Sequence, residues 1–259
     1  MRIDSHVHGD PKALTGDLDA YIEACRSNGV EAVVLIEEAD RCLEAVELCG
    51  DFVIPVARVA MDHATAVEIE AIVRAGCLGI KFIQPAAPYG DERYWPLYEK
   101  LEQLGRPAVF HTGYLGCSGR ELNPVCMEHM RAAQVERIAR RFPDLKMLMA
   151  HYSNPWWEEG WKVSMSSPNV YADLSGGTAI LRSTRMWSDL LAPDGQILEA
   201  SIRKLCFGSD VGYFREGEFP FKPNIDFYER IFDAIDLPPE LREQVNRGNV
   251  RTIFGLNGT

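Results

Sequence analysis

Short apolar runs alternate with amphipathic stretches along the whole chain. The apolar runs, such as "EAVVLI", "DFVIPVARV" and "KMLMAH", are rich in Val, Ile, Leu and Met, which is typical of strands buried on both faces. They predict eight strands: one that begins at Arg2 and ends at His8, then 31–36, 51–59, 77–83, 107–111, 145–151, 169–175 and 204–210. Because the stretches between them have helical spacing, the pattern predicts a parallel sheet with crossover helices.

The helix predictions rest on apolar spacing and on signals at helix ends. In the first helix, over 17–29, Leu18, Ile22 and Cys25 fall on one face. Further helices are predicted over 65–76, 94–105, 130–142 and 179–192, with two short ones within 238–256. Asp40 is predicted to cap a short helix, and Asn154 to cap another in which Pro155 is the first residue.

Eight strands alternating with helices in 259 residues predict a single α/β domain, residues 1–259, folded as a (β/α)8 TIM barrel with C-terminal helices. An open, doubly wound sheet is the alternative, since both folds alternate strand and helix. The composition, 46% hydrophobic and 25% charged, is ordinary for a globular protein and adds nothing against either fold.

Charge and composition exclude several classes of function. The net charge of −11 disfavours a nucleic-acid-binding surface, which depends on Lys and Arg. The sequence has no run of about 18 apolar residues and no secretory signal pattern, so we expect no membrane contact. Seven cysteines without a C-x-x-C pair indicate reduced thiols and a cytoplasmic location. The expected partner is a small-molecule substrate; self-association into a homo-oligomer stays open.

Groups that can bind a metal recur at the ends of the predicted strands. His6 and His8 end the first strand, His111 the fifth, His151 the sixth and Asp210 the eighth. In a barrel these ends meet at one rim, and residues i and i+2 of a strand face the same way. An H-x-H pair alone is a weak signal, but the whole set predicts a metal site. Imidazole and carboxylate ligands suit Zn²⁺, and also Mn²⁺ or Fe²⁺.

Each of these residues also has a structural interpretation. Asp210 could cap a turn, and His151 could be a core histidine bonded to backbone. Lys81, within the fourth strand, could pair with a carboxylate. Asp173, at the end of the seventh strand, is a weaker candidate ligand.

The segments "IDSHVH", "GIKFIQP", "VFHTG", "MLMAHYSNPWW", "VYADLSG" and "CFGSD" occur in an order that resembles the amidohydrolase superfamily. The closer resemblance is to its amidohydrolase-related branch (amidohydrolase 2), which includes the aminocarboxymuconate-semialdehyde decarboxylase-like enzymes. This resemblance implies a mononuclear site with His6, His8, His111 and Asp210 as ligands and His151 as the catalytic imidazole. A binuclear relative implies instead that a carboxylated Lys81 bridges two ions, with His111 and His151 on the second. One ion is favoured, because the closer branch usually works that way.

Two reactions follow from such a site. In the first, a metal-activated water, with Asp210 as its proton acceptor and His151 beside the carbonyl, hydrolyses an amide, a lactone or another ester. In the second, the metal grips the carboxylate of a small acid and the enzyme is a non-oxidative decarboxylase. A nuclease is disfavoured by the acidic charge, and a non-catalytic scaffold by the complete ligand set.

Side chains near the predicted rim are candidates for substrate contact. Lys81 and Arg120 are the cationic candidates, while Tyr152 and Trp156, just after the sixth strand, are expected to wall the pocket. The segment 112–131 is expected to arch over the mouth, because loops of this length in compact domains are often functional.

Overall fold

A computed structural model of the chain describes all residues except 117–124, 177, 213, 215–218 and 257–259. Its strands are β1 (Arg2–His8), β2 (Val30–Glu37), β3 (Val53–Val59), β4 (Gly79–Phe82), β5 (Ala108–His111), β6 (Met147–Ala150), β7 (Val170–Asp173), β8 (Leu205–Cys206) and β9 (Val211–Gly212). All neighbouring strands are parallel, in the order β8-β7-β6-β5-β4-β3-β2-β1-β9. The sequential order matches a barrel rather than a doubly wound sheet.

The eighth position of the barrel is shared by two short strands. β8 pairs with β7, whereas β9 pairs with β1. Between them, the backbone N–H of Ser5 donates to the carbonyl of Phe207 (2.9 Å), so the sheet closes on itself. The predicted (β/α)8 TIM barrel is therefore confirmed, with a break in its last strand that places Asp210 at the rim.

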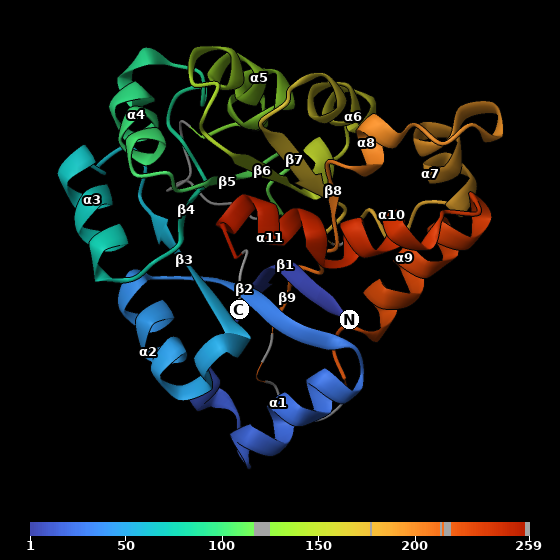
Figure 1. The fold of residues 1–259 in the computed structure, drawn as a ribbon. Helices are drawn as coiled ribbons and strands as arrows, with labels where there is room; N and C mark the ends of the chain where they lie inside the picture. The colour runs from blue at the N-terminus through green and yellow to red at the C-terminus, as the bar shows by residue number, and fades with distance from the viewer. Residues whose placement is uncertain (117–124, 177, 213, 215–218, 257–259) are drawn as a thin grey trace.

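Helices surround the barrel (Figure 1). They are α1 (Leu18–Ser27), α2 (Ala39–Cys49), α3 (Ala66–Ala75), α4 (Trp95–Gln103), α5 (Ala132–Arg141), α6 (Trp157–Ser166), α7 (Thr184–Leu191), α8 (Glu199–Ile202), α9 (Lys222–Ala234), α10 (Pro239–Glu243) and α11 (Asn249–Phe254). A π-helical segment, Gln244–Gly248, joins α10 to α11. Helix α9 is not among the predicted helices, although its first turn carries Pro223 and its buried face repeats aromatic residues.

Two apolar clusters show which strand faces point inward and outward. The inner cluster lies inside the barrel and includes Ile54 and Val56 of β3, Val109 of β5 and Leu148 of β6. Residues of α11 belong to it, so this helix plugs the amino end of the barrel, and it crosses the centre of the view in Figure 1. Opposite to it, the carboxyl ends of the strands form the rim.

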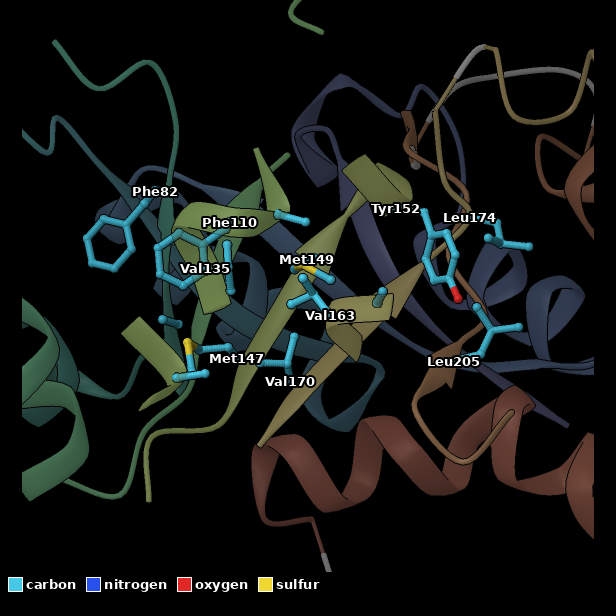
Figure 2. Close-up of a cluster of buried hydrophobic side chains, with 14 of the residues drawn as sticks. Phe82, Phe110, Val135, Met147, Met149, Tyr152, Val163, Val170, Leu174 and Leu205 are labelled. Carbon is cyan, nitrogen blue, oxygen red and sulfur yellow. The ribbon is translucent and has the colours of Figure 1, made fainter. Parts of the chain in front are cut away.

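The outer cluster lies between the strands and the surrounding helices. Figure 2 shows part of it, where Phe110 of β5 and Met149 of β6 lie near Val135 of α5 and Val163 of α6. Burial of these side chains contributes roughly 25 cal/mol per Å² of apolar surface and holds the helices against the sheet. The rigid barrel that results is the support for side chains at the rim.

Two predicted helix caps are wrong. Glu38 precedes α2, and Asp40 lies within its first turn, where a carboxylate still interacts favourably with the helix dipole. Before α6, the three residues His151–Ser153 have positive φ and form a tight turn. Asn154 belongs to this turn, because its N–H donates to the carbonyl of His151 (2.9 Å), and α6 begins only after Trp156.

Candidate active site

A cavity of about 310 Å³ opens at the carboxyl ends of the strands. It is lined by His6, His8, Arg58, Lys81, Ile83, His111, Leu115, Gly116, His151 and Asp210. The structure therefore brings all five predicted metal ligands, and the predicted lysine, to one place. Arg58 is the lining residue with a charged side chain that the sequence analysis missed. It stands two residues after Val56 and four after Ile54, so the inward alternation of β3 would have revealed it.

An irregularity in β1 directs its two histidines toward the cavity. The pairing of β1 with β2 shifts register between Asp4 and Val7, as at a β-bulge, a feature common next to active sites. The buried carboxylate of Asp4 accepts from the backbone N–H of His6 and of Ser209, each at 3.0 Å. This contact fastens the end of β1 to the segment that carries Asp210.

Three ligand atoms converge within the cavity. His6 Nε2 and His8 Nε2 are 3.2 Å apart, and the Oδ1 of Asp210 lies 3.4 and 3.5 Å from them. Tetrahedral ligands at 2.0–2.1 Å from a zinc ion are about 3.3 Å from one another. These three side chains form a group of possible metal ligands, and the observed spacings fit a divalent ion.

Backbone carbonyls determine which nitrogen of three histidines carries the hydrogen. A carbonyl oxygen only accepts, so Nδ1 of His8 donates to Ile36 (2.8 Å) and Nδ1 of His151 donates to Ser175 (3.1 Å). Their Nε2 atoms are then left with a lone pair. His111 has the opposite arrangement, since its Nε2 contacts the carbonyl of Tyr114 (3.2 Å). Such contacts orient metal-binding histidines and set their tautomer.

Asp173 anchors the far side of the site. Its side chain is fully buried, and its Oδ1 accepts from the backbone N–H of His151 and of Ser175, each at 3.0 Å. The hydroxyl of Ser175 also donates to Asp173 and lies 3.3 Å from Nδ1 of His6. Asp173, His6 and His151 form a second group whose ligand atoms lie close together.

His111 lies outside both groups. Its ring is buried and packs edge-on against the ring of His151, with centroids 4.6 Å apart. Within the described part of the chain, the structure thus places His111 at the cavity wall but not among the converging ligand atoms. Its assignment as a ligand stays a prediction.

Burial favours the neutral form of three imidazoles of the site, those of His6, His111 and His151. It lowers the pKa of His6 to about 3, with the charge of Lys81 as the next contribution. Burial likewise lowers the pKa of His111 and of His151. Because a neutral imidazole has a lone pair, these side chains are ready to bind a metal or accept a proton.

Asp210 and Lys81 carry the charges of the site. Burial raises the pKa of the Asp210 carboxyl, but the contacts with His8 and His6 outweigh it and hold the pKa well below its ordinary value. The backbone N–H of Asp210 donates to the carbonyl of His6 (2.8 Å), which fixes the carboxylate beside the histidines. Burial lowers the pKa of Lys81 to about 8, and its Nζ lies 3.4 Å from His6 Nε2.

Two of the predicted substrate contacts lie elsewhere, and a third cannot be placed. Tyr152 points into the outer core near Leu174 and Leu205 (Figure 2) and packs against Trp187, so it does not wall the cavity. Trp156 lines a separate cavity beside α6 and α7, with Arg131 over its ring. The tight turn of His151–Ser153 redirects both side chains away from the rim. Arg120 is outside the described residues.

The closed barrel and the histidine–aspartate group at its carboxyl rim define the class of (β/α)8 barrels whose rim can hold a divalent metal. Residues 31–256 match the sequence model of the family described as Amidohydrolase, so the chain belongs to this family. The predicted resemblance is thereby confirmed. The match begins after β1, so His6 and His8 are placed by the structure and not by the family match. A sequence search of curated proteins gave no match.

Solved structures share the fold at low sequence identity. An uncharacterized TIM-barrel protein from Bordetella bronchiseptica has a TM-score of 0.69 and 17% identity over 98% of both chains. A dihydroxybenzoic acid decarboxylase from Polaromonas, with bound manganese and the inhibitor 2-nitroresorcinol, has a TM-score of 0.64 and 18% identity over 100% of this chain and 98% of that one. A probable 2-pyrone-4,6-dicarboxylic acid hydrolase from Acinetobacter baumannii, with citric acid bound, has a TM-score of 0.62 and 13% identity over 98% of this chain and 99% of that one.

Proposed function

We propose that this protein is a metal-dependent hydrolase that opens an amide, a lactone or another ester bond of a small molecule. The observation that carries the proposal is the convergence of His6 Nε2, His8 Nε2 and Asp210 Oδ1 within 3.2–3.5 Å of one another in the cavity. Zn²⁺ fits the spacing and the ligand types, and Mn²⁺ or Fe²⁺ also suit them. Such an ion would act as a Lewis acid that acidifies a bound water and polarises a carbonyl.

The side chains around these three ligand atoms have different roles in the proposed reaction. Asp210 is held ionised at the edge of the cavity, where it can orient a water and accept its proton. His151 is neutral and keeps its Nε2 lone pair, so it can receive the proton that Asp210 accepts from the water and pass it to the leaving group. Asp173 and Ser175 act as positioning residues, since they hold the rings and not the substrate.

Lys81 bears on whether the site holds one metal ion or two. With its pKa near 8, about a tenth of the amine is neutral at pH 7, and only a neutral amine can be carboxylated by carbon dioxide. In the binuclear form, the carboxylated lysine would bridge two ions. We propose one ion, because the converging group of His6, His8 and Asp210 is complete without Lys81.

A second candidate is the non-oxidative decarboxylation of a small acid. It is favoured by the two cationic side chains of the cavity, Lys81 and Arg58, which suit a carboxylate substrate. Decarboxylases and hydrolases both occur among the structures that share this fold, at similar TM-scores.

One assay separates the two reactions. The protein is reconstituted with Zn²⁺, Mn²⁺ or Fe²⁺ and given a panel of lactones, amides, esters and aromatic acids, while released acid and released carbon dioxide are both recorded. The proposal expects bond opening without carbon dioxide, abolished by a chelator and by His8→Ala. Carbon dioxide release without hydrolysis supports the decarboxylase instead. Activity that survives the chelator and His8→Ala would contradict both.

A further inference from the structure

Two cationic side chains lie next to each other on one wall of the cavity. Arg58 of β3 and Lys81 of β4 are register partners in adjacent parallel strands, and both line the cavity. Lys81 is buried at its base, whereas the side chain of Arg58 is 45% exposed and stands nearer the mouth. The ligand atoms of His6, His8 and Asp210 belong to other strand positions, at β1 and before β9. The cavity thus has a positive wall: Lys81 touches the metal-binding group at His6 Nε2 (3.4 Å), and Arg58 extends the wall toward the mouth.

The guanidinium of Arg58 is largely uncommitted. Within the described residues, its ion pair is with Glu38 at 3.9 Å, the long limit for such a pair, and Glu38 is itself 69% exposed. Exposed ion pairs of this kind contribute little to stability. A guanidinium has five N–H donors, so most of those of Arg58 remain available to a ligand in the cavity. An arginine at the mouth of a small cavity makes the local potential positive in an otherwise acidic protein, which favours an anionic ligand there, and Glu38 neutralises this charge only weakly.

We propose that Arg58 is a substrate-binding residue that pairs with a carboxylate of the substrate, distinct from the bond that reacts. This inference rests on the proposed function and narrows it to small organic acids that carry a second, reactive carbonyl group. The planar fork of arginine matches the two oxygens of a carboxylate. Ile83 and Leu115 offer apolar contact to the carbon skeleton between the two ends, and a cavity of about 310 Å³ limits the substrate to a small molecule.

A binding experiment tests this assignment without requiring turnover. The zinc-loaded protein is titrated calorimetrically with benzene-1,3-dicarboxylate and with its neutral diamide. The wild type is expected to bind the diacid at least 10-fold more tightly. Arg58→Ala should lower the affinity for the diacid about 10- to 100-fold, which is the scale of hydrogen bonds to a charged group. It should change the affinity for the diamide less than about 3-fold. Arg58→Lys should retain part of the affinity that Arg58→Ala loses, because lysine keeps the positive charge but lacks the planar guanidinium.

Two variants serve as controls. Arg41→Ala removes an exposed arginine of α2 outside the cavity and should leave both affinities unchanged. Glu38→Gln removes the competing carboxylate and should leave the diacid as tight as in the wild type or tighter.

Several results would overturn the assignment. The first is a wild type that binds the diacid no more tightly than the diamide. The second is an Arg58→Ala protein whose affinities for the diacid and the diamide fall equally. The third is a wild type that binds phenyl phosphate 10-fold more tightly than the diacid. If the hydrolase proposal fails but the diacid still depends on Arg58, only the reaction is wrong. If hydrolysis is found and Arg58→Ala binds the diacid normally, only the substrate class is wrong.

Discussion

Asp173→Asn is the substitution that most directly tests how the site is held. The carboxylate is fully buried and accepts four hydrogen bonds, from the N–H of His151, the N–H and hydroxyl of Ser175, and the hydroxyl of Ser5 at 3.2 Å. Asparagine has nearly the same shape but replaces one charged oxygen by an NH₂ group. The donors therefore lose a charged acceptor while the packing stays the same.

The magnitude follows from the balance between these bonds and burial. Burial raises the pKa of Asp173, but its contacts with His6 and Ser175 outweigh this effect and hold the net pKa below its ordinary value, so stabilisation of the charged form exceeds the desolvation cost. A hydrogen bond to a charged group contributes about 1.5–3 kcal/mol, against about 0.5–1.5 for a neutral one. Four weakened bonds, partly offset by the easier burial of an amide, give a loss of about 2–4 kcal/mol in the free energy of unfolding.

The assay is urea unfolding at pH 8 in the presence of a chelator, followed by zinc titration of the folded protein. Zinc affinity should fall about 10- to 100-fold, because the partners of His6 and His151 are disturbed. Asp51→Asn is the matched control: its carboxylate is 92% exposed and paired only at the surface, so the change should stay below about 1 kcal/mol. An Asp173→Asn protein whose unfolding free energy is within about 0.5 kcal/mol of the wild type, with normal zinc affinity, would show that Asp173 does not hold the site in place.

Three further predictions concern the same site. Asp210→Asn should reduce metal content and lower turnover by about 10² or more, measured by metal analysis and initial rates; near wild-type turnover would exclude the proton-acceptor role. Lys81→Met should keep about one metal equivalent and should remove any dependence on bicarbonate, whereas loss of the ion would favour the binuclear form. In the metal-free protein, the folded pKa values of His6, His111 and His151 lie below the unfolded value near 6.5, so stability is complete above that pH and is lost as the pH falls toward 3. Urea unfolding between pH 7.5 and 5.5 should show a decrease of up to about 1.4 kcal/mol per pH unit for each histidine below pH 6.5, and a flat profile would contradict their burial in the neutral form.

In the described part of the chain, no helix combines the length and the apolar character needed to cross a bilayer.

The barrel and the histidines and aspartate of the candidate metal site could be predicted from the sequence alone. Strand and helix periods are local, so eight apolar runs and the helices between them could be found without knowing any contact. His6, His8, His111, His151 and Asp210 could be predicted because parallel strands bring their carboxyl ends to one place, whatever the details of packing. The predicted helix ends were less reliable, as Asp40 and Asn154 show. A capping residue depends on the path of the turn that precedes the helix.

How these side chains meet depends on contacts between distant parts of the chain. The register shift in β1 and the split eighth strand bring His6 and Asp210 together, and neither feature leaves a local pattern in the sequence. The turn after β6 sends Tyr152 into the core, although its position in the sequence favoured the cavity. The alternation of β3 could have marked Arg58 as an inward residue, but only the order and register of the strands place it beside Lys81. Contacts between residues distant in sequence depend on strand register and turn geometry, which the whole fold determines and no single segment encodes.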